Sequence, residues 1–173
     1  MNINPFVKSN YTRRMGDHYP TVDPRCIKAL LNTWGDHITT PAVDVCTTKG
    51  IASPLLPAVS GDLKDMLGAY RTVITNPPYR RPLVDKIVNL IVDSVEDNHI
   101  DLAAILVRIS WDAAKTRKHL FCGNKNYAGK TILLFRPFWS AERKASPIHN
   151  YQWLIWRKTK TLCDPIVKYS GGE

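Results

Sequence analysis

The sequence predicts an α/β fold built on a mostly parallel sheet with a late antiparallel strand pair. Short apolar and β-branched runs alternate with amphipathic helical stretches, as in strands joined by crossover helices. The runs over 131–135 and 151–156 follow each other with no helical pattern between them, which favours antiparallel pairing there. A chain of 173 residues with 44% hydrophobic residues can bury one sizeable core. We therefore expect a polar N-terminal arm over 1–18 and a single domain over 19–173.

Each helix and strand is predicted from the period of its apolar residues. The first helix, over 25–34, has Asp23 as its N-cap and Pro24 at its first position, and Gly35 follows its end. The helix over 82–95 begins at a proline and carries an apolar stripe at helical spacing. A third helical stretch is expected over 112–120, and strands are expected over 42–46, 73–75, 102–107, 131–135, 151–156 and 165–169.

The segment Asn76-Pro77-Pro78-Tyr79 directly follows the buried strand over 73–75. Neither proline can donate a ladder hydrogen bond, so the strand must end here. Asn76 precedes a proline and is therefore biased towards extended backbone. We expect a stiff elbow at the carboxyl end of the strand, where the Asn76 side-chain oxygen and the Pro77 carbonyl are held outward as acceptors.

Two neighbouring acceptors of this kind suit an exocyclic amine on a planar substrate. The lone pair of such an amine is delocalised into the ring or carbonyl, which makes the nitrogen a poor nucleophile. Hydrogen bonds from both amine protons to Asn76 and Pro77 draw the nitrogen towards tetrahedral geometry. Tyr79 can stack on the substrate ring. The plain alternative is a proline turn after a core strand.

Asn76-Pro77-Pro78-Tyr79 resembles motif IV (Asp/Asn-Pro-Pro-Tyr) of S-adenosylmethionine-dependent amino-methyltransferases. A strand ending in Arg108, a strand followed by Arg136-Pro137-Phe138-Trp139, and a strand of the form Trp-x-x-Trp come next. Their order and spacing look like the phage-type DNA N6-adenine methyltransferases, over about 19–169. The resemblance implies a Rossmann-like class I methyltransferase sheet, with Asn76, Pro77, Pro78 and Tyr79 as the catalytic residues.

The same resemblance implies S-adenosylmethionine as the cofactor and places a set of residues around it. Tyr19 and Thr21 would lie near its methionine end. Asp44, within the strand over 42–46, and Thr48 and Gly50, on the loop after that strand, would line the cofactor. Asp62 would accept a hydrogen bond from its adenine. Asp62 can equally be interpreted as a helix cap. Thr48 stands where the family has a glycine that allows close backbone approach, so the glycine loop is degenerate. Too few residues separate Gly50 from Thr72 for two further strands, so we expect a sheet shortened on the cofactor side.

The net charge of +9 favours a polyanionic partner. Basic residues interleave with aromatic ones in a pattern that suits a phosphate backbone and unstacked bases; the aromatic members are Tyr79, Trp111, Tyr127 and Trp139. Phosphate contacts are expected from Arg80, Arg81, Arg117 and Lys125. We expect a nucleic acid as the partner, double-stranded DNA first. No stretch is left for a separate target-recognition domain, so a homodimer or a partner protein is expected to supply recognition.

Other classes of protein are disfavoured. No apolar run approaches the roughly 20 residues of a membrane helix, and the first residues lack the apolar stretch and cleavage site of a secretory signal. The cysteines lie far apart and fit neither a zinc site nor a disulfide scaffold; they are Cys26, Cys46, Cys122 and Cys163. We therefore expect reduced thiols, no metal and a cytoplasmic protein.

These observations lead to one functional expectation and two alternatives. The first is transfer of a methyl group from S-adenosylmethionine to adenine N6 in DNA. Thr48, and the lack of a visible acidic residue for the cofactor ribose, favour instead a catalytically inactive methyltransferase-like protein that binds nucleic acid or regulates another enzyme. A third alternative keeps the chemistry and moves it to an amine in RNA or to a protein glutamine. The positive charge favours nucleic acid over protein as the substrate.

Overall fold

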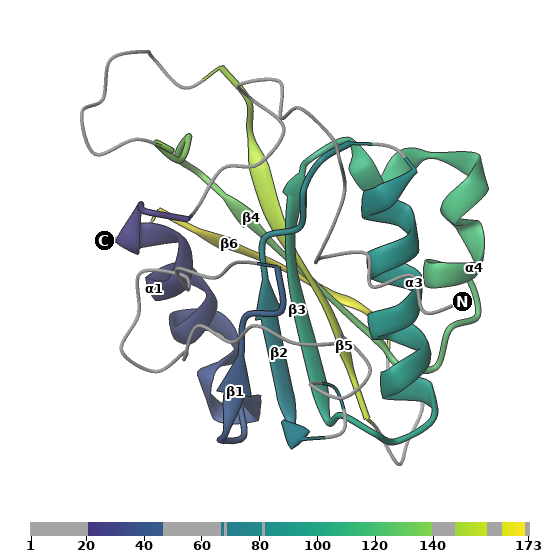
Figure 1. Cartoon of the computed structure of the whole chain (residues 1–173). Coiled ribbons are helices and arrows are strands. Elements are labelled where there is room, and N and C mark those ends of the chain that lie inside the picture. The colour runs from purple at the N-terminus through teal and green to yellow at the C-terminus, as the bar shows by residue number, and fades with distance from the viewer. Residues whose placement is uncertain are drawn as a thin grey trace, which may run out of the picture.

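The computed structural model describes residues 21–46, 67, 69–80, 82–139, 148–158 and 164–171. They form an α/β fold around a six-stranded mixed sheet in the order β1-β2-β3-β5-β4-β6 (Figure 1). The strands are β1 (Ala42–Val43), β2 (Thr72–Thr75), β3 (Leu102–Arg108), β4 (Tyr127–Leu133), β5 (Tyr151–Arg157) and β6 (Ile166–Ser170). The helices are α1 (Pro24–Trp34), α3 (Leu83–Glu96) and α4 (Lys118–Phe121), with 3-10 turns at Gly35–His37, Trp111–Ala113 and Lys115–Arg117. The predicted arm over 1–18 lies outside the described residues.

One strand, β5, runs against the other strands of the described sheet. β1, β2 and β3 pair in parallel, and so do β4 and β6, whereas β5 is antiparallel to both of its neighbours, β3 and β4. The prediction of a mostly parallel sheet with a late antiparallel pair is therefore confirmed. β5 enters the sheet between β3 and β4, and its residues from Tyr151 to Trp156 are all buried, as befits a central strand.

Helices cover both faces of the sheet, with α1 on one face and α3 and α4 on the other (Figure 1). The alternation of side chains along β5 divides the core between these two layers. Trp153 and Ile155 pack on the side of α1, whereas Leu154 and Trp156 pack on the side of α3. All four residues of β2 are buried, so the strand that precedes the predicted elbow lies in the middle of this core.

The two longer helices match their predictions to within one residue at each end. α1 begins directly after Asp23, whose side chain accepts a hydrogen bond from the Arg25 N–H, and Gly35 follows its last residue. The prediction of one helix over 112–120 is wrong. Two 3-10 turns and the single-turn α4 occupy this stretch, because Ala114 has extended backbone (φ −77°, ψ 130°) and interrupts any continuous helix.

Two strands differ from their expected ranges by more than one residue. β1 is shorter than 42–46, and β4 begins at Tyr127 rather than at 131. The early part of β4 contains an irregularity between Tyr127 and Gly129, where the register with β5 shifts. Gly129 has a φ of +135°, and a Cβ there would lie 2.0 Å from the Ile166 carbonyl oxygen. Glycine at this position therefore lets β6 approach β4 closely enough to pair with it.

Candidate active site at the carboxyl ends of the parallel strands

Candidate functional residues follow three neighbouring parallel strands. Asp44 comes after β1, Asn76 comes after β2, and Arg108 is the last residue of β3. Parallel strands end at the same edge of a sheet, which is called the carboxyl edge below. Because β5 runs the other way, its first residue, Tyr151, pairs with Arg108 at this edge. The ends of these strands therefore gather at one edge of the sheet.

Asp44 is a buried carboxylate at the start of this edge, with 1% of its surface exposed. Its Oδ1 accepts hydrogen bonds from the Thr75 hydroxyl at 2.6 Å and from the Cys46 N–H at 3.0 Å. Burial raises the pKa of Asp44 to about 7, although both hydrogen bonds oppose the shift. Near neutral pH the side chain therefore exists in both protonation states, and it ties the end of β1 to the last residue of β2.

The elbow after β2 holds the predicted amine acceptor. Asn76 is 4% exposed, Pro77 is buried, and Pro78 and Tyr79 are half-buried. The Tyr79 hydroxyl donates a hydrogen bond to the Asn76 side-chain oxygen. Burial, followed by the neighbouring Tyr151, raises the pKa of Tyr79 well above its usual range, so this hydroxyl stays protonated and remains a donor. The oxygen expected to receive a substrate amine thus receives a donor from the chain itself.

An aromatic group continues from Tyr79 along the carboxyl edge. The Tyr79 and Tyr151 rings are 5.7 Å apart with their planes tilted by 49°, and Trp139 meets Tyr151 edge-on at 4.9 Å. The Arg108 guanidinium lies 5.7 Å from the centroid of the Tyr79 ring. We call Tyr79, Tyr151 and Trp139 the aromatic wall. The wall and the Asn76 amide offer rings and a polar acceptor side by side, which suits a flat ligand that carries an amine.

Two of the residues predicted to contact the cofactor can be placed. Asp44 lies at the carboxyl edge as expected. Thr21 is 2% exposed, and its hydroxyl has no hydrogen-bond partner within the described part of the chain. The other members of the predicted set, Tyr19, Thr48, Gly50 and Asp62, lie outside the described residues.

The prediction that Arg117 contacts phosphate does not fit its position. Its side chain is 3% exposed, and its Nε is 2.8 Å from the Asp85 carboxylate on α3. Its Nη1 donates to the Trp111 carbonyl, and the guanidinium lies 4.1 Å from the centroid of the Trp111 ring. Arg117 is thus an internal brace between α3 and the turns before α4, and it cannot reach a surface ligand.

The other predicted phosphate contacts divide between the two edges of the sheet. Arg80 is exposed directly after the elbow, at the carboxyl edge. Lys125 is also exposed but precedes β4, so it lies at the opposite edge, where the Arg157 N–H at the end of β5 bonds to the Asn126 carbonyl. The seven residues of β4 separate the two edges by roughly 20 Å. Lys125 therefore does not join the candidate site, and Arg81 lies outside the described residues.

Two aromatic residues that were expected to meet bases belong to the core instead. Trp111 is 8% exposed. Tyr127 packs against Phe121 at 5.0 Å and against Trp156 at 5.5 Å. Both lie on the α3 side of the sheet, in the cluster that contains Trp156. Of the interleaved aromatic residues, Tyr79 and Trp139 are those that the structure places at the carboxyl edge.

Sequence reasoning marked the strand ends at Arg108 and Arg136 but gave no site role to either arginine, nor to Tyr151. Arg108 and Arg136 are exposed at or just after the ends of β3 and β4, and the Arg136 Nε donates to the Asn150 side chain at 3.1 Å. Tyr151 joins the aromatic wall because β5 enters the sheet beside β3. The arginines had a usable signal, since each stands at the end of a predicted parallel strand. Tyr151 had none, because its place depends on where β5 pairs.

Other kinds of site are not found in the described part of the chain. It contains no cluster of three or more His, Cys, Asp or Glu side chains that could hold a metal ion. None of its helices has the length and apolar character needed to cross a membrane. Comparison with known proteins adds no family: no protein-family model matches the chain, and no curated protein matches it in sequence.

Proposed function

We propose that this protein transfers a methyl group from S-adenosylmethionine to the exocyclic N6 amine of adenine in DNA. The observation that carries the proposal is the hydrogen bond from the Tyr79 hydroxyl to the Asn76 oxygen at the end of buried β2. This hydrogen bond means that the Asn76 oxygen accepts from a donor within the elbow. A substrate amine would take the place of this hydroxyl, with its ring against the aromatic wall.

The residues of the elbow would act by orientation and hydrogen bonding. The sulfonium of S-adenosylmethionine supplies a methyl group on a good leaving group, so no strong base is required beforehand. Asn76 is held by burial, and the two following prolines restrict the backbone. Its oxygen and the Pro77 carbonyl would receive the amine protons and turn the nitrogen lone pair towards the methyl carbon. Tyr79 would fix the plane of the base.

The cofactor side of the proposal draws on Thr21 and Asp44. A buried hydroxyl without a partner carries a cost in free energy, so the Thr21 hydroxyl fits a polar ligand group from outside the described chain. Asp44, between the ends of β1 and β2, would border the same ligand. The resemblance to the methyltransferases implies cofactor contacts for both residues.

Nucleic acid as the substrate carrier is supported by three arginines at the carboxyl edge. Arg80, Arg108 and Arg136 are all exposed there, next to the aromatic wall and the elbow. Exposed guanidinium groups at the same edge as the aromatic wall suit contacts to the phosphates of a nucleic acid. The net charge of +9 acts in the same direction.

The test has a binding stage and a turnover stage. S-adenosylmethionine and S-adenosylhomocysteine are titrated calorimetrically into the protein, and tritium transfer from S-adenosylmethionine to adenine-containing duplex DNA is then measured. We expect micromolar cofactor binding and methylation that Asn76→Ala abolishes. Asn89→Ala, on α3, where the half-buried Asn89 amide bonds to the Asp85 carbonyl and to His119, is the matched control and should retain activity. Cofactor binding without any labelled DNA would reject the substrate named here.

A second candidate is a catalytically inactive methyltransferase-like protein that binds nucleic acid or regulates another enzyme. The observation that favours it is the same contact: the Asn76 oxygen is already engaged by Tyr79. Thr48 in the glycine loop adds to this case. The absence of cofactor binding at millimolar ligand, together with salt-dependent DNA binding, would select this candidate over the enzyme.

A further inference from the structure

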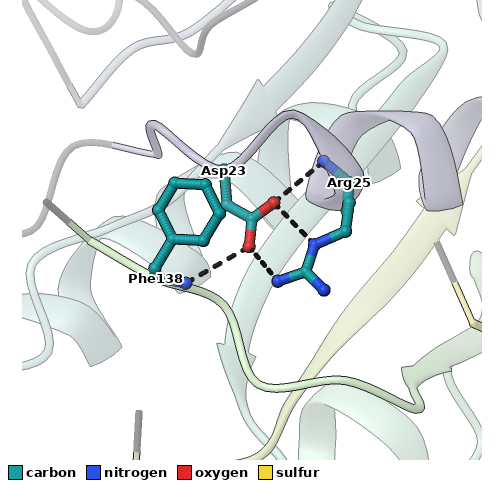
Figure 2. Close-up of polar contacts among 3 residues, drawn as sticks. All are labelled: Asp23, Arg25 and Phe138. Atoms are coloured by element: carbon teal, nitrogen blue, oxygen red, sulfur yellow. Dashed lines mark hydrogen bonds and ion pairs between the residues drawn. The ribbon is translucent and has the colours of Figure 1, made fainter. Parts of the chain in front are cut away.

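Asp23 makes more contacts than the capping of a helix requires. It is fully buried, and its Oδ1 accepts hydrogen bonds from the Arg25 N–H at 3.1 Å and from the Arg25 Nε at 3.0 Å (Figure 2). Its Oδ2 accepts from the Arg25 Nη2 at 2.7 Å and from the Phe138 N–H at 3.2 Å. An N-cap needs one such bond to the first turn of its helix. The other bonds tie Asp23 to a guanidinium and to a segment 115 residues further along the chain.

The segment that Asp23 holds leads directly to the aromatic wall. Phe138 lies after β4, where the chain has left the sheet, and the next residue is Trp139. The Arg25 guanidinium also lies 4.4 Å from the centroid of the Phe135 ring and 5.7 Å from that of Phe138, so it covers two rings of the same segment. The start of α1 thus contacts both the backbone and the aromatic rings of the segment that contains Phe135 and Phe138.

Electrostatics favours a persistent contact. Burial by itself acts to raise the pKa of Asp23, but the hydrogen bonds from Arg25 and from the Phe138 and Arg25 N–H groups outweigh it and lower the pKa. The carboxylate is therefore charged at neutral pH, and charge-assisted hydrogen bonds of this kind are short and directional. Such a contact specifies where the Phe138 backbone lies as well as stabilising it.

We propose that Asp23 and Arg25 are positioning residues that hold Trp139 against Tyr151 and thereby set the shape of the aromatic wall. The contacts run from Asp23 to the Phe138 N–H, from Trp139 to Tyr151 at 4.9 Å, and from Tyr151 to Tyr79 at 5.7 Å. Tyr79 in turn bonds to Asn76. The role of the wall in base binding rests on the proposed function, whereas the placement of Trp139 can be measured without it.

The test replaces tryptophan with 5-fluorotryptophan and follows Trp139 by fluorine NMR, with its resonance assigned through Trp139→Phe. Asp23→Ser keeps a hydroxyl that can cap α1 but loses the second oxygen for Phe138 and the charge for Arg25. Arg25→Met keeps an unbranched apolar side chain and removes the charge and the donors of the guanidinium, and it serves if Asp23→Ser does not fold. We expect the Trp139 resonance to shift and broaden in both variants, and the resonance of Trp156, which packs on the α3 side of the sheet and bonds to the Leu120 carbonyl, to stay in place.

The matched control is Arg71→Met, which breaks another two-point arginine–aspartate pair. The Arg71 Nε and Nη2 bond to Asp101 at 2.8 and 2.5 Å, at the opposite edge of the sheet. This variant should leave the Trp139 resonance unchanged. Asp23→Ser and Arg25→Met could lower the melting temperature and yet leave the Trp139 resonance unchanged. In that case the pair is an ordinary cap and ion pair, and the inference is overturned.

A second readout connects the placement of Trp139 to ligand binding. In Arg25→Met the KM for adenine-containing DNA should rise by about tenfold or more, because small displacements of positioning groups have large effects. Affinity for S-adenosylmethionine should stay within about twofold, because the side-chain contacts of Arg25 are with Asp23, Phe135 and Phe138. If the wild-type protein methylates no DNA, the proposed function fails, and the fluorine spectrum still decides whether Asp23 and Arg25 position Trp139.

Discussion

The Tyr79 hydroxyl and the Asn76 side-chain oxygen are hydrogen-bonded to each other across the two prolines of the elbow. Under the proposed function this contact competes with the substrate amine, whereas the Tyr79 ring assists binding. The two parts of one side chain therefore have opposite effects on the reaction, and substitutions can separate them.

We predict that Tyr79→Phe retains methylation with a KM for DNA equal to or below that of the wild-type protein. Phenylalanine keeps the ring for stacking and removes the donor that competes with the amine. Tyr79→Ala should raise this KM about tenfold or more, because base–aromatic stacking contributes about 1 to 3 kcal/mol. Steady-state kinetics on one duplex substrate gives the KM of wild type, Tyr79→Phe and Tyr79→Ala for comparison. A loss of activity in Tyr79→Phe as large as in Tyr79→Ala would mean that the hydroxyl itself takes part in the reaction.

Asp44 predicts a pH dependence of stability. Its pKa is about 7 in the folded protein against a usual value of 3.8, so the folded state holds the proton more tightly than the unfolded chain. The free energy of unfolding therefore contains a contribution that is fully present below about pH 4 and is lost as the pH rises to about 7. Asp44→Asn keeps the oxygen that accepts from Thr75 and does not titrate. We expect wild type to lose stability relative to Asp44→Asn over this range, by on the order of 1 to 4 kcal/mol.

Urea unfolding at pH 4, 5.5, 7 and 8 measures this difference. From about pH 8 the gap between the two proteins should become constant, because the carboxyl is then ionised in both the folded and the unfolded state. Thr75→Val serves as a further check, because it removes a donor to the carboxylate. This variant should have a lower free energy of unfolding at every pH, and its stability should still fall as the pH rises. A parallel pH dependence in wild type and Asp44→Asn would assign the titration to another group.

The elements that could be predicted are those whose pattern is local. Asp23 and Pro24 mark the start of α1, and the prolines after Asn76 mark the end of β2, because capping and the missing proline N–H act within a few residues. Arg117 could not be placed in this way. Its burial depends on Asp85, far along the chain on α3, and an arginine that pairs across a fold has the same sequence appearance as one that faces solvent.

The candidate site likewise contains residues whose place follows from local pattern and strand order, and residues whose place depends on distant contacts. Asn76 and Asp44 reach one edge because parallel strands end together, which the order of strands already implies. Tyr151 reaches that edge because β5 pairs between β3 and β4, and pairing across a sheet is set by the whole core. Lys125 lies at the opposite edge because it precedes β4 and β4 runs in the same direction as β3; the predicted antiparallel pair left open which of its two strands runs against the others.

Salt dependence distinguishes the two edges of the sheet. Arg108→Gln and Arg136→Gln should each weaken binding to a short duplex and reduce the slope of log K against log salt by about 0.9, the value for one lost phosphate contact. Lys125→Gln, at the opposite edge, is the control and should leave the slope unchanged. Fluorescence anisotropy at several salt concentrations gives these slopes. An equal reduction in Lys125→Gln would place the nucleic acid elsewhere on the protein.

Arg117→Met should destabilise the fold without changing the slope for nucleic acid binding. The substitution leaves the Trp111 carbonyl and the Asp85 carboxylate without their buried partner. Because Asp85 is 31% exposed and can be partly hydrated, we expect a loss of about 2 to 3 kcal/mol in the free energy of unfolding, at the low end for a broken buried pair. Arg71→Met, which breaks an exposed pair with Asp101, should cost less than about 1 kcal/mol. Similar losses in both variants would show that burial of Arg117 adds nothing to its ion pair.

Gly129→Ala should separate β6 from β4. A Cβ at Gly129 would lie 2.0 Å from the Ile166 carbonyl oxygen, a backbone atom that cannot rotate away, and the φ of +135° is strained for alanine. Gly123 has a φ of +77° with nothing within 4 Å of its Cβ position, so Gly123→Ala meets the backbone strain without the collision. We expect losses in the free energy of unfolding of about 1 kcal/mol for Gly123→Ala and about 3 kcal/mol or more for Gly129→Ala.

Hydrogen exchange should show lost protection at Ile166–Ser170 in Gly129→Ala alone, since β6 is an edge strand paired to β4. Intact protection there would mean that β6 moves as a unit and re-forms its hydrogen bonds around the added methyl group.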